Sequence, residues 1–225
     1  MEKKYKLTEE ICYDFLGIKL YRIEALKDFG IVKKGDKGGY IENENNLSQE
    51  GDCWIYGNTK VSDKAIVCGN AQVSGNAQVF GNATVYGNAL VYGNAKVFDD
   101  AKVYDGAKVY GDAIVSNNAI VVNKAIVCGN AKVFGNAVIY DNAIVCGNAQ
   151  VCGCAEIKNN SDYIIFKNWW SSGRHFTWTR NNNMWKVGCF YGTGKELIAK
   201  AYKDSEISGR EYERVVNYVE AIIRQ

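Results

Sequence analysis

The sequence predicts a mainly β fold whose centre is a parallel β-helix, a chain wound into stacked triangular coils. Three observations predict it. Residues 51–158 repeat in units of six, each unit has a small residue followed two places later by Val or Ile, and most units contain a Gly-Asn or similar pair. A fixed internal period of this kind identifies a solenoid.

Each six-residue unit corresponds to one short strand and one corner. Alternation with period two places the small residue and the aliphatic residue inward, as for Ala71 and Val73. Glycine and asparagine adopt positive φ at little cost, which a corner every six residues requires. Three corners close a coil of 18 residues, so we expect about six coils. One inward ladder should contain Val73, Val91, Val109 and Val127.

Residues 18 apart should then stack on one another at about 4.8 Å, the spacing between strands. Similar side chains do recur at that interval, which gives a prism roughly 30 Å long with open edges only at its ends. The recurring aromatic residues are Phe80, Phe98 and Phe134 on one face, Tyr86, Tyr104 and Tyr140 on another, and Tyr56, Tyr92 and Tyr110 on the remaining face.

Residues 1–50 are expected to cap the first coil. They contain a probable strand at 21–26 and a turn-rich stretch at 35–40. The stretch from Asp28-Phe29-Gly30 through Gly38-Gly39-Tyr40-Ile41 to Trp54-Ile55-Tyr56 resembles the leader of a bacterial and bacteriophage family of hexapeptide-repeat proteins. Its members are labelled as transferases or polymer-forming proteins. The resemblance implies a left-handed helix, although crossover rules alone would favour the right hand. It also implies a phage or prophage setting, and it transfers no catalytic residues.

Residues 159–225 differ in composition and should form a separate α+β module. We expect a strand at 163–169, and a hairpin of strands 174–180 and 184–191. Two capping-box patterns, Thr193-Gly194-Lys195-Glu196 and Ser208-Gly209-Arg210-Glu211, predict the starts of two helices. The module resembles the C-terminal extensions of phage-type proteins.

Composition excludes several classes of function. With 27 basic and 25 acidic residues, the chain lacks the global field that attracts DNA or anionic membranes. The N-terminal residues are not expected to form a signal peptide, and no run has the length of a membrane span. The eight cysteines are therefore expected to be reduced thiols in the cytoplasm of a bacterial host cell.

Enzymes on hexapeptide scaffolds include CoA-dependent acyltransferases, which commonly use a histidine base, and carbonic anhydrases, in which three histidines hold the metal. This chain has one histidine, His175, outside the coils. One chain cannot supply a three-histidine zinc site, although a threefold axis could bring three copies of His175 together. We therefore predict no catalytic residue and no cofactor, and an acyltransferase with another base stays an alternative.

Two further patterns are interpreted as structural. Cys128, Cys146 and Cys152 occupy positions that hold Tyr, Phe or Ser in other units, so they are interpreted as small apolar residues rather than as metal ligands. The stretch 192–195 lacks the spacing of a phosphate-binding loop. No metal site is predicted.

The predicted hairpin is the strongest candidate for binding. Alternation places Arg174, Phe176, Trp178 and Arg180 on one face, and such a surface can stack a base and pair a phosphate. Residues 159–225 also carry ten basic and seven acidic side chains. The alternative is that the tryptophans form the core of a small domain. The predicted ligand-binding residues are Trp169, Trp170, Arg174, His175, Trp178, Arg180, Trp185 and Lys186.

The outward residues of the coils are often polar in the first half and become apolar in the second. We expect a continuous apolar band that is covered by a neighbouring subunit, in a trimer, or by the C-terminal module. Its residues are Ile114, Ile120, Val122, Ile126, Val138, Tyr140 and Ile144.

The favoured function is that of a non-catalytic, oligomeric binding protein of phage type. It would sequester a nucleotide-like host defence signal or inhibit a host protein, without membrane or bulk DNA binding. Two alternatives stay open, a structural protein that polymerises and a CoA-dependent acyltransferase.

Overall fold

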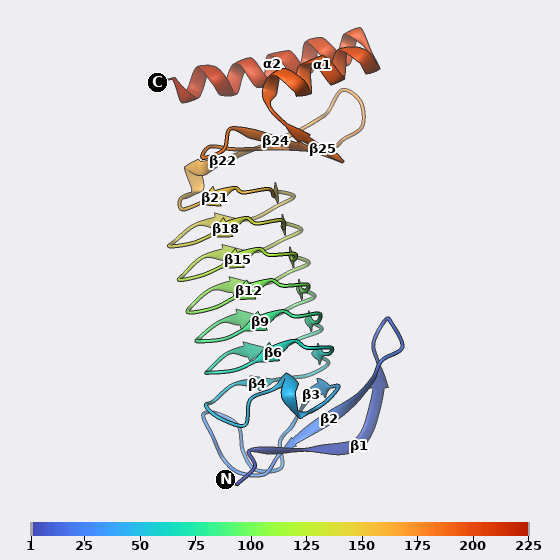
Figure 1. Ribbon diagram of the computed structural model, residues 1–225, viewed down its shortest axis with the longest axis vertical. Helices are drawn as coiled ribbons and strands as arrows, with labels where there is room; N and C mark the ends of the chain where they lie inside the picture. Colours follow the sequence, from blue (N-terminus) through green and yellow to red (C-terminus); the bar gives the residue numbers. More distant parts are fainter. Residues whose placement is uncertain (1, 225) are drawn as a thin grey trace.

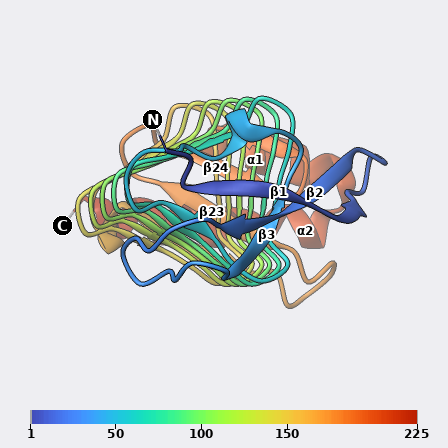
Figure 2. The same cartoon turned by 90° about the horizontal axis from the view of Figure 1, so that it is seen from below.

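The computed structural model describes residues 2–224 and shows an elongated prism of stacked coils. Antiparallel strands lie at its N-terminal end, and a small sheet with two helices lies at its C-terminal end (Figure 1). Seen along the axis, the coils superpose (Figure 2). The predicted mainly β fold with a left-handed parallel β-helix is confirmed.

The coils consist of two-residue strands in three parallel sheets, one for each face of the prism. Strands in register are 18 residues apart, as for Val91 and Val109. The first face contains β5 (Lys60–Val61), β8 (Gln78–Val79), β11 (Lys96–Val97), β14 (Ile114–Val115), β17 (Lys132–Val133) and β20 (Gln150–Val151). The second contains β4 (Trp54–Ile55), β7 (Gln72–Val73), β10 (Leu90–Val91), β13 (Lys108–Val109), β16 (Ile126–Val127) and β19 (Ile144–Val145). The third contains β6 (Ile66–Val67), β9 (Thr84–Val85), β12 (Lys102–Val103), β15 (Ile120–Val121), β18 (Val138–Ile139) and β21 (Glu156–Ile157).

The interior is an apolar column. Alanine and valine or isoleucine alternate inward, and Val73, Val91, Val109 and Val127 are all 0% exposed, so the predicted ladder is confirmed. Corners require positive φ, which glycine adopts without strain. At Gly75 (φ +74) a Cβ would lie 2.9 Å from the carbonyl oxygen of Gly93 in the next coil, too close for any other residue without a shift.

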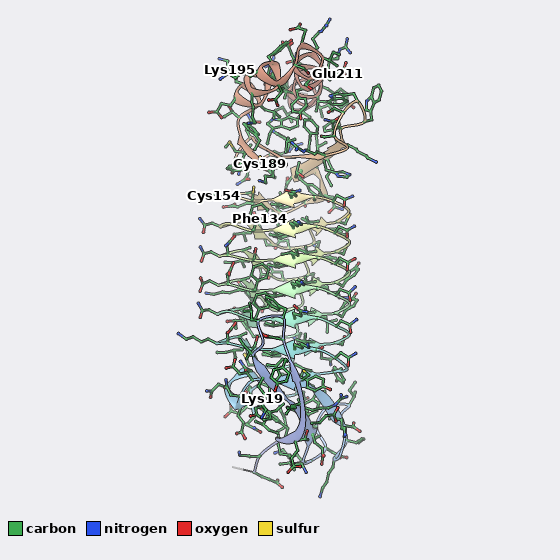
Figure 3. The ribbon with its side chains drawn as sticks, turned by 90° about the vertical axis from the view of Figure 1, so that its right-hand side faces the viewer. Lys19, Phe134, Cys154, Cys189, Lys195 and Glu211 are labelled. Carbon is green, nitrogen blue, oxygen red and sulfur yellow. The ribbon has the colours of Figure 1, made fainter. Side chains whose placement is uncertain are left out.

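Outward side chains repeat in rows along the prism (Figure 3). The rings of Phe80 and Phe98 stack at 4.7 Å, as predicted from the 18-residue interval. At one corner, Asn76 Nδ2 donates to Asn94 Oδ1 at 3.2 Å, so side-chain hydrogen bonds also join successive coils. Each coil therefore interacts mainly with its two neighbours.

The N-terminal segment contains β1 (Tyr5–Tyr13), β2 (Lys19–Ala25), β3 (Lys37–Ile41) and the 3₁₀ turn η1 (Glu44–Asn46). The strand expected at 21–26 lies within β2, and β1 was not predicted. β1, β2 and β3 are antiparallel, but β3 pairs in parallel with β5 and so extends the first face by one rung. The tip of the β1–β2 hairpin packs Phe15 against Phe80, with ring centroids 5.2 Å apart.

The C-terminal module contains the 3₁₀ turn η2 (Asn160–Asp162), β22 (Tyr163–Lys167), β23 (His175–Thr179), β24 (Met184–Val187), β25 (Phe190–Gly192), α1 (Gly194–Asp204) and α2 (Glu206–Ile223). The four strands form one antiparallel sheet. The strand expected at 184–191 is divided by a turn at Gly188, whose φ is +55°. Thus the hairpin is extended by one strand.

The first capping box is confirmed, because Thr193 Oγ1 accepts from Glu196 N and Glu196 Oε2 accepts from Thr193 N. The second is wrong. α2 begins at Glu206, and the side chain of Ser205 caps it by accepting from Ser208 N. One residue separates the two helices, so α2 starts earlier than the pattern indicated. Neither helix is long and apolar enough to cross a membrane.

Candidate functional site

One face of the C-terminal sheet packs against the helices. Phe176, Trp178 and Trp185 are at most 2% exposed and form a core with Leu197 and residues of α2. Trp178 Nε1 donates to Asn183 Oδ1 at 2.8 Å, which satisfies the buried indole. The prediction that Trp178 lies on an exposed face with Arg174 and Arg180 is therefore wrong, because α1 and α2 cover that face.

The opposite face of the sheet packs against the last coil. The amide of Gln150 donates to Thr177 Oγ1 at 2.9 Å, and Asn148 Nδ2 lies 3.4 Å from His175 Nε2. The Lys186 ammonium lies 5.6 Å from the centre of the Phe134 ring. His175 and Lys186, predicted as ligand-binding residues, thus face the coil and hold the module on it.

The remaining predicted residues are dispersed. Trp169 is 81% exposed and meets the half-buried Trp170 edge to face at 6.1 Å. The Arg180 guanidinium donates through Nε to the carbonyl oxygen of Ser161 at 3.2 Å. Among the predicted binding residues, Arg174 is the one that lines the cavity described next.

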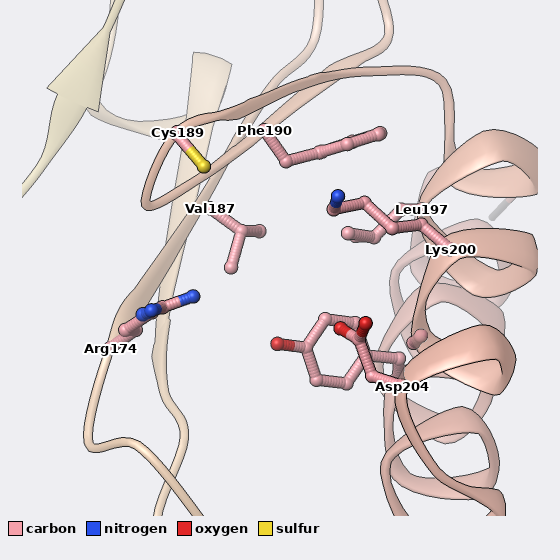
Figure 4. A pocket seen from close by; sticks show the side chains of 9 residues that line it. Arg174, Val187, Cys189, Phe190, Leu197, Lys200 and Asp204 are labelled. Atoms are coloured by element: carbon pink, nitrogen blue, oxygen red, sulfur yellow. The ribbon is translucent and has the colours of Figure 1, made fainter.

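This cavity, of about 30 Å³, lies between the sheet and the helices (Figure 4). The turn between β24 and β25 and the start of β23 form one wall, and α1 forms the facing wall. Its lining residues are Arg174, Val187, Cys189, Phe190, Leu197, Lys200, Ala201, Asp204 and Tyr212.

The charges at the cavity favour an anion. Arg174 and Lys200 approach from opposite walls, and Asp204 is the one carboxylate that lines it. Within residues 2–224, neither cation has an ion-pair partner. Burial raises the pKa of Tyr212, while a hydrogen bond from Asn168 and the charge of Arg174 act in the opposite direction. Tyr212 therefore keeps its proton at neutral pH and can donate a hydrogen bond.

Sequence reasoning missed Lys200, Asp204 and Tyr212. Lys200 and Asp204 are four residues apart on an exposed helix face, a pattern common on helix surfaces. Nothing in the sequence placed that face opposite Arg174. Within the described part of the chain, no group of three or more His, Cys, Asp or Glu residues could hold a metal ion.

The predicted apolar band is not continuous. Consecutive units turn a corner, so Ile114 lies on the first face, Ile120 on the third and Ile126 on the second. Ile114 stacks between Lys96 and Lys132, which interrupts the first face with charges. Apolar residues do pair between two successive coils, Ile120 with Val138 and Ile126 with Ile144. The prediction of one band is wrong, and the predicted trimer stays a prediction.

Comparison with known proteins identifies the repeats. Residues 71–85, 77–93 and 139–153 match the family model described as YdcK beta solenoid repeat. A protein of Escherichia coli (strain K12), described as the uncharacterized acetyltransferase YdcK, is 38% identical over 78 residues. The match covers 31% of this chain and 24% of that protein, so the chain spans about a quarter of the relative's length.

These matches confirm that the chain is a hexapeptide-repeat β-helix protein, similar over part of its length to a protein described as an uncharacterized acetyltransferase. The family matches lie within the coils and do not reach the C-terminal module. The resemblance of that module to phage-type extensions therefore stays a prediction.

Proposed function

We propose that the protein is a binding protein whose C-terminal module holds a small anionic ligand, a carboxylate or a phosphate ester, with the β-helix as its scaffold. The observation that carries this proposal is the approach of Arg174 and Lys200 to one cavity from opposite walls. It keeps the binding function predicted from the sequence and moves it away from the exposed hairpin face.

The two cations would contribute differently. The guanidinium of Arg174 can bind a carboxylate or phosphate through two parallel hydrogen bonds, whereas Lys200 acts as a point charge. Val187, Phe190 and Leu197 line the same space and lower the local dielectric constant, which strengthens these interactions. The hydroxyl of Tyr212 adds a neutral donor. Asp204 would repel a second negative charge, or pair with an amino group on the ligand.

The size of the cavity limits the ligand. Its volume of about 30 Å³ is far below the roughly 300–1,000 Å³ of typical ligand pockets, so the cavity could take the carboxylate or phosphate group of a small ligand while the rest of that ligand stayed outside. In the phage setting that the leader resemblance implies, sequestration of a small host signal is one use for such a site.

An acyltransferase is the second candidate, because the similar Escherichia coli protein is described as an uncharacterized acetyltransferase. General base catalysis requires a group within hydrogen-bonding reach of the proton that it removes. His175 lies against Asn148 on the coil side of the sheet and does not line the cavity. An acyltransferase would therefore need a different base.

Calorimetric titration with inorganic phosphate, glutamate and phosphoserine tests the proposal. The variants Arg174→Gln and Lys200→Gln should each bind about tenfold or more weakly, because hydrogen bonds to charged groups contribute about 1.5–3 kcal/mol. Lys203→Gln is the matched control, since Lys203 is exposed on the same helix and outside the cavity. Binding should also weaken as salt is added.

Failure of the wild-type protein to bind any of these anions would reject the proposal, as would wild-type affinity in the double variant. Turnover of acetyl-CoA by the wild-type protein, lost in a variant that keeps its fold, would instead favour the acyltransferase.

A further inference from the structure

The tyrosine ladder on the third face has a gap one ring deep. Tyr86 and Tyr104 occupy successive rungs and stack at 4.6 Å, with 7° between their planes. The next rung carries Val122, and the rung after it carries Tyr140. One coil therefore lacks the ring that continues the stack.

The gap has the dimensions of a flat ring. Rungs are about 4.8 Å apart, so Tyr104 and Tyr140 lie roughly 9.6 Å apart along the prism. A planar ring placed midway would lie roughly 4.8 Å from each, close to the separation of Tyr86 and Tyr104. Val122, 9% exposed, forms the floor.

A groove opens at this point. The groove has a volume of about 500 Å³ and is bordered by Tyr104, Asp105, Val122, Asn123, Val138, Tyr140 and Glu156. A second groove shares Asp105 and Asn123 and continues around the corner past Lys124 and Asp141. The gap in the ladder is thus apolar at its floor and polar at its side.

The polar side offers mainly hydrogen-bond acceptors. Asn123 is fixed at a corner with φ +63°, and its Nδ2 donates to Asp141 Oδ1 at 3.0 Å, which leaves its Oδ1 free to accept. The carboxylates of Asp105 and Glu156 line the same groove. Among the residues that the structure describes, Lys124 is the one cation that lines either groove. A ring with amino donors would be matched here, whereas a phosphate would be repelled.

We propose that this gap, the ladder slot, binds a nucleobase or nucleoside that carries an exocyclic amino group. The ring would lie between Tyr104 and Tyr140 in place of the missing tyrosine, with its amino group toward Asp105 and Asn123. The slot is separate from the cavity beside Arg174, and the proposal does not depend on the anion-binding function.

Filling the slot with the protein's own side chain is the sharpest test. Val122→Tyr restores the residue found at this position in three other coils, so it should fold and keep or raise the melting temperature. Adenosine, guanosine and cytidine would be titrated by calorimetry and by saturation-transfer NMR. Val122→Tyr should lose binding by roughly tenfold or more, since base–aromatic stacking contributes that much. Val122→Ala should retain it.

The first face supplies a matched control. Ser116 leaves a similar gap between Phe98 and Phe134 in the phenylalanine ladder. Ser116→Phe fills that gap and should leave nucleoside binding unchanged. If Val122→Tyr fails to fold, nucleoside binding can be measured in Tyr104→Leu and Tyr140→Leu instead. Each of these variants removes one stacking ring and should weaken binding.

The proposal is overturned if the wild-type protein binds none of these nucleosides, if Val122→Tyr binds them normally, or if Ser116→Phe abolishes binding. A dimer that Val122→Tyr dissociates, without nucleoside binding by the wild type, would assign the slot to a neighbouring chain and also overturn it. Arg174→Gln should leave nucleoside binding intact, which separates this result from the test of the anion site.

Discussion

The two ends of the β-helix expose opposite backbone groups. Between coils, each strand amide donates to a carbonyl of the next coil, as Gln72 N does to Ala89 O at 2.9 Å. The first coil therefore has carbonyls without partners from a preceding coil, and the last coil has amides without partners from a following one. Buried backbone groups without hydrogen bonds destabilise a fold, so the first end needs donors and the last end needs acceptors.

The N-terminal cap supplies donors. The ammonium of Lys4, 1% exposed, donates to the carbonyl oxygens of Gly51 at 3.2 Å and Cys53 at 3.0 Å. The side-chain nitrogen Nδ2 of Asn46 donates to the carbonyl oxygens of Asp63 at 3.0 Å and Ala65 at 2.9 Å.

The C-terminal cap supplies acceptors, at least one for each face. The amide of Ile144 donates to Asn160 Oδ1 at 2.8 Å, that of Gln150 to Thr177 Oγ1 at 2.9 Å, and that of Glu156 to Asn181 Oδ1 at 2.9 Å. The caps are therefore not interchangeable. Because both ends are covered, end-to-end polymerisation of the coils would require displacement of the caps.

The largest effect should come from removal of the C-terminal cap. A chain that ends at residue 158 exposes three strand edges and the apolar column at once. Open edges of this kind pair with other chains. We expect association into large or insoluble species, measured by analytical ultracentrifugation and electron microscopy. A monodisperse monomer with the melting temperature of the full chain would contradict the capping role.

Removal of the buried donor at the other end should have the next largest effect. Lys4→Met keeps the approximate volume of the side chain and leaves several carbonyls without a donor. Each unsatisfied group costs about 1–3 kcal/mol, so we expect a loss of about 3 kcal/mol or more in urea unfolding. Lys3→Met is the control, because Lys3 is exposed and, among residues 2–224, forms an ion pair only with Glu44, so its loss should cost less than about 1 kcal/mol. Equal losses in the two variants would show that Lys4 is not a cap.

A single acceptor at the C-terminal end should matter less. Thr177→Val removes the hydroxyl that accepts from Gln150 N and should cost about 1–2 kcal/mol. Hydrogen exchange at the Gln150 amide should accelerate, while Thr177→Ser should preserve both stability and exchange. Unchanged protection of this amide in Thr177→Val would indicate that another group accepts its hydrogen bond.

Thiol labelling gives the smallest and most local effect. Cys152 is 5% exposed beneath the C-terminal cap, and burial raises its pKa to about 11, although Lys186 opposes the shift. A raised pKa keeps the thiol protonated, so at pH 8 about one molecule in a thousand carries the reactive thiolate. Iodoacetamide should label the exposed Cys154 first, as mass spectrometry of the peptides would show. Equal labelling rates at Cys152 and Cys154 would mean that the C-terminal cap opens freely. The variant Thr177→Val should label Cys152 faster than the wild-type protein does.

The sequence by itself determined the coils, because each residue there meets the residue 18 positions away. Period two fixed which side chains point inward, and the 18-residue interval fixed which rings stack. The same interval places Ile114, Ile120 and Ile126 on three faces, because consecutive units turn a corner and only residues 18 apart are neighbours on one face. The gap at Val122 can likewise be read from the sequence.

Only the tertiary structure decided what covers each surface of the C-terminal module. Alternation places Trp178 and Thr177 on opposite faces of β23. It does not predict that helices cover one of these faces and the last coil covers the other. The cavity beside Arg174 depends on α1, which follows later in the chain and whose charged face looks like any solvated helix surface. Lys4 likewise reads as a surface lysine until the carbonyls of the first coil surround it. Burial in these regions depends on contacts between segments that have no fixed spacing in the sequence. Such contacts cannot be predicted from a sequence period.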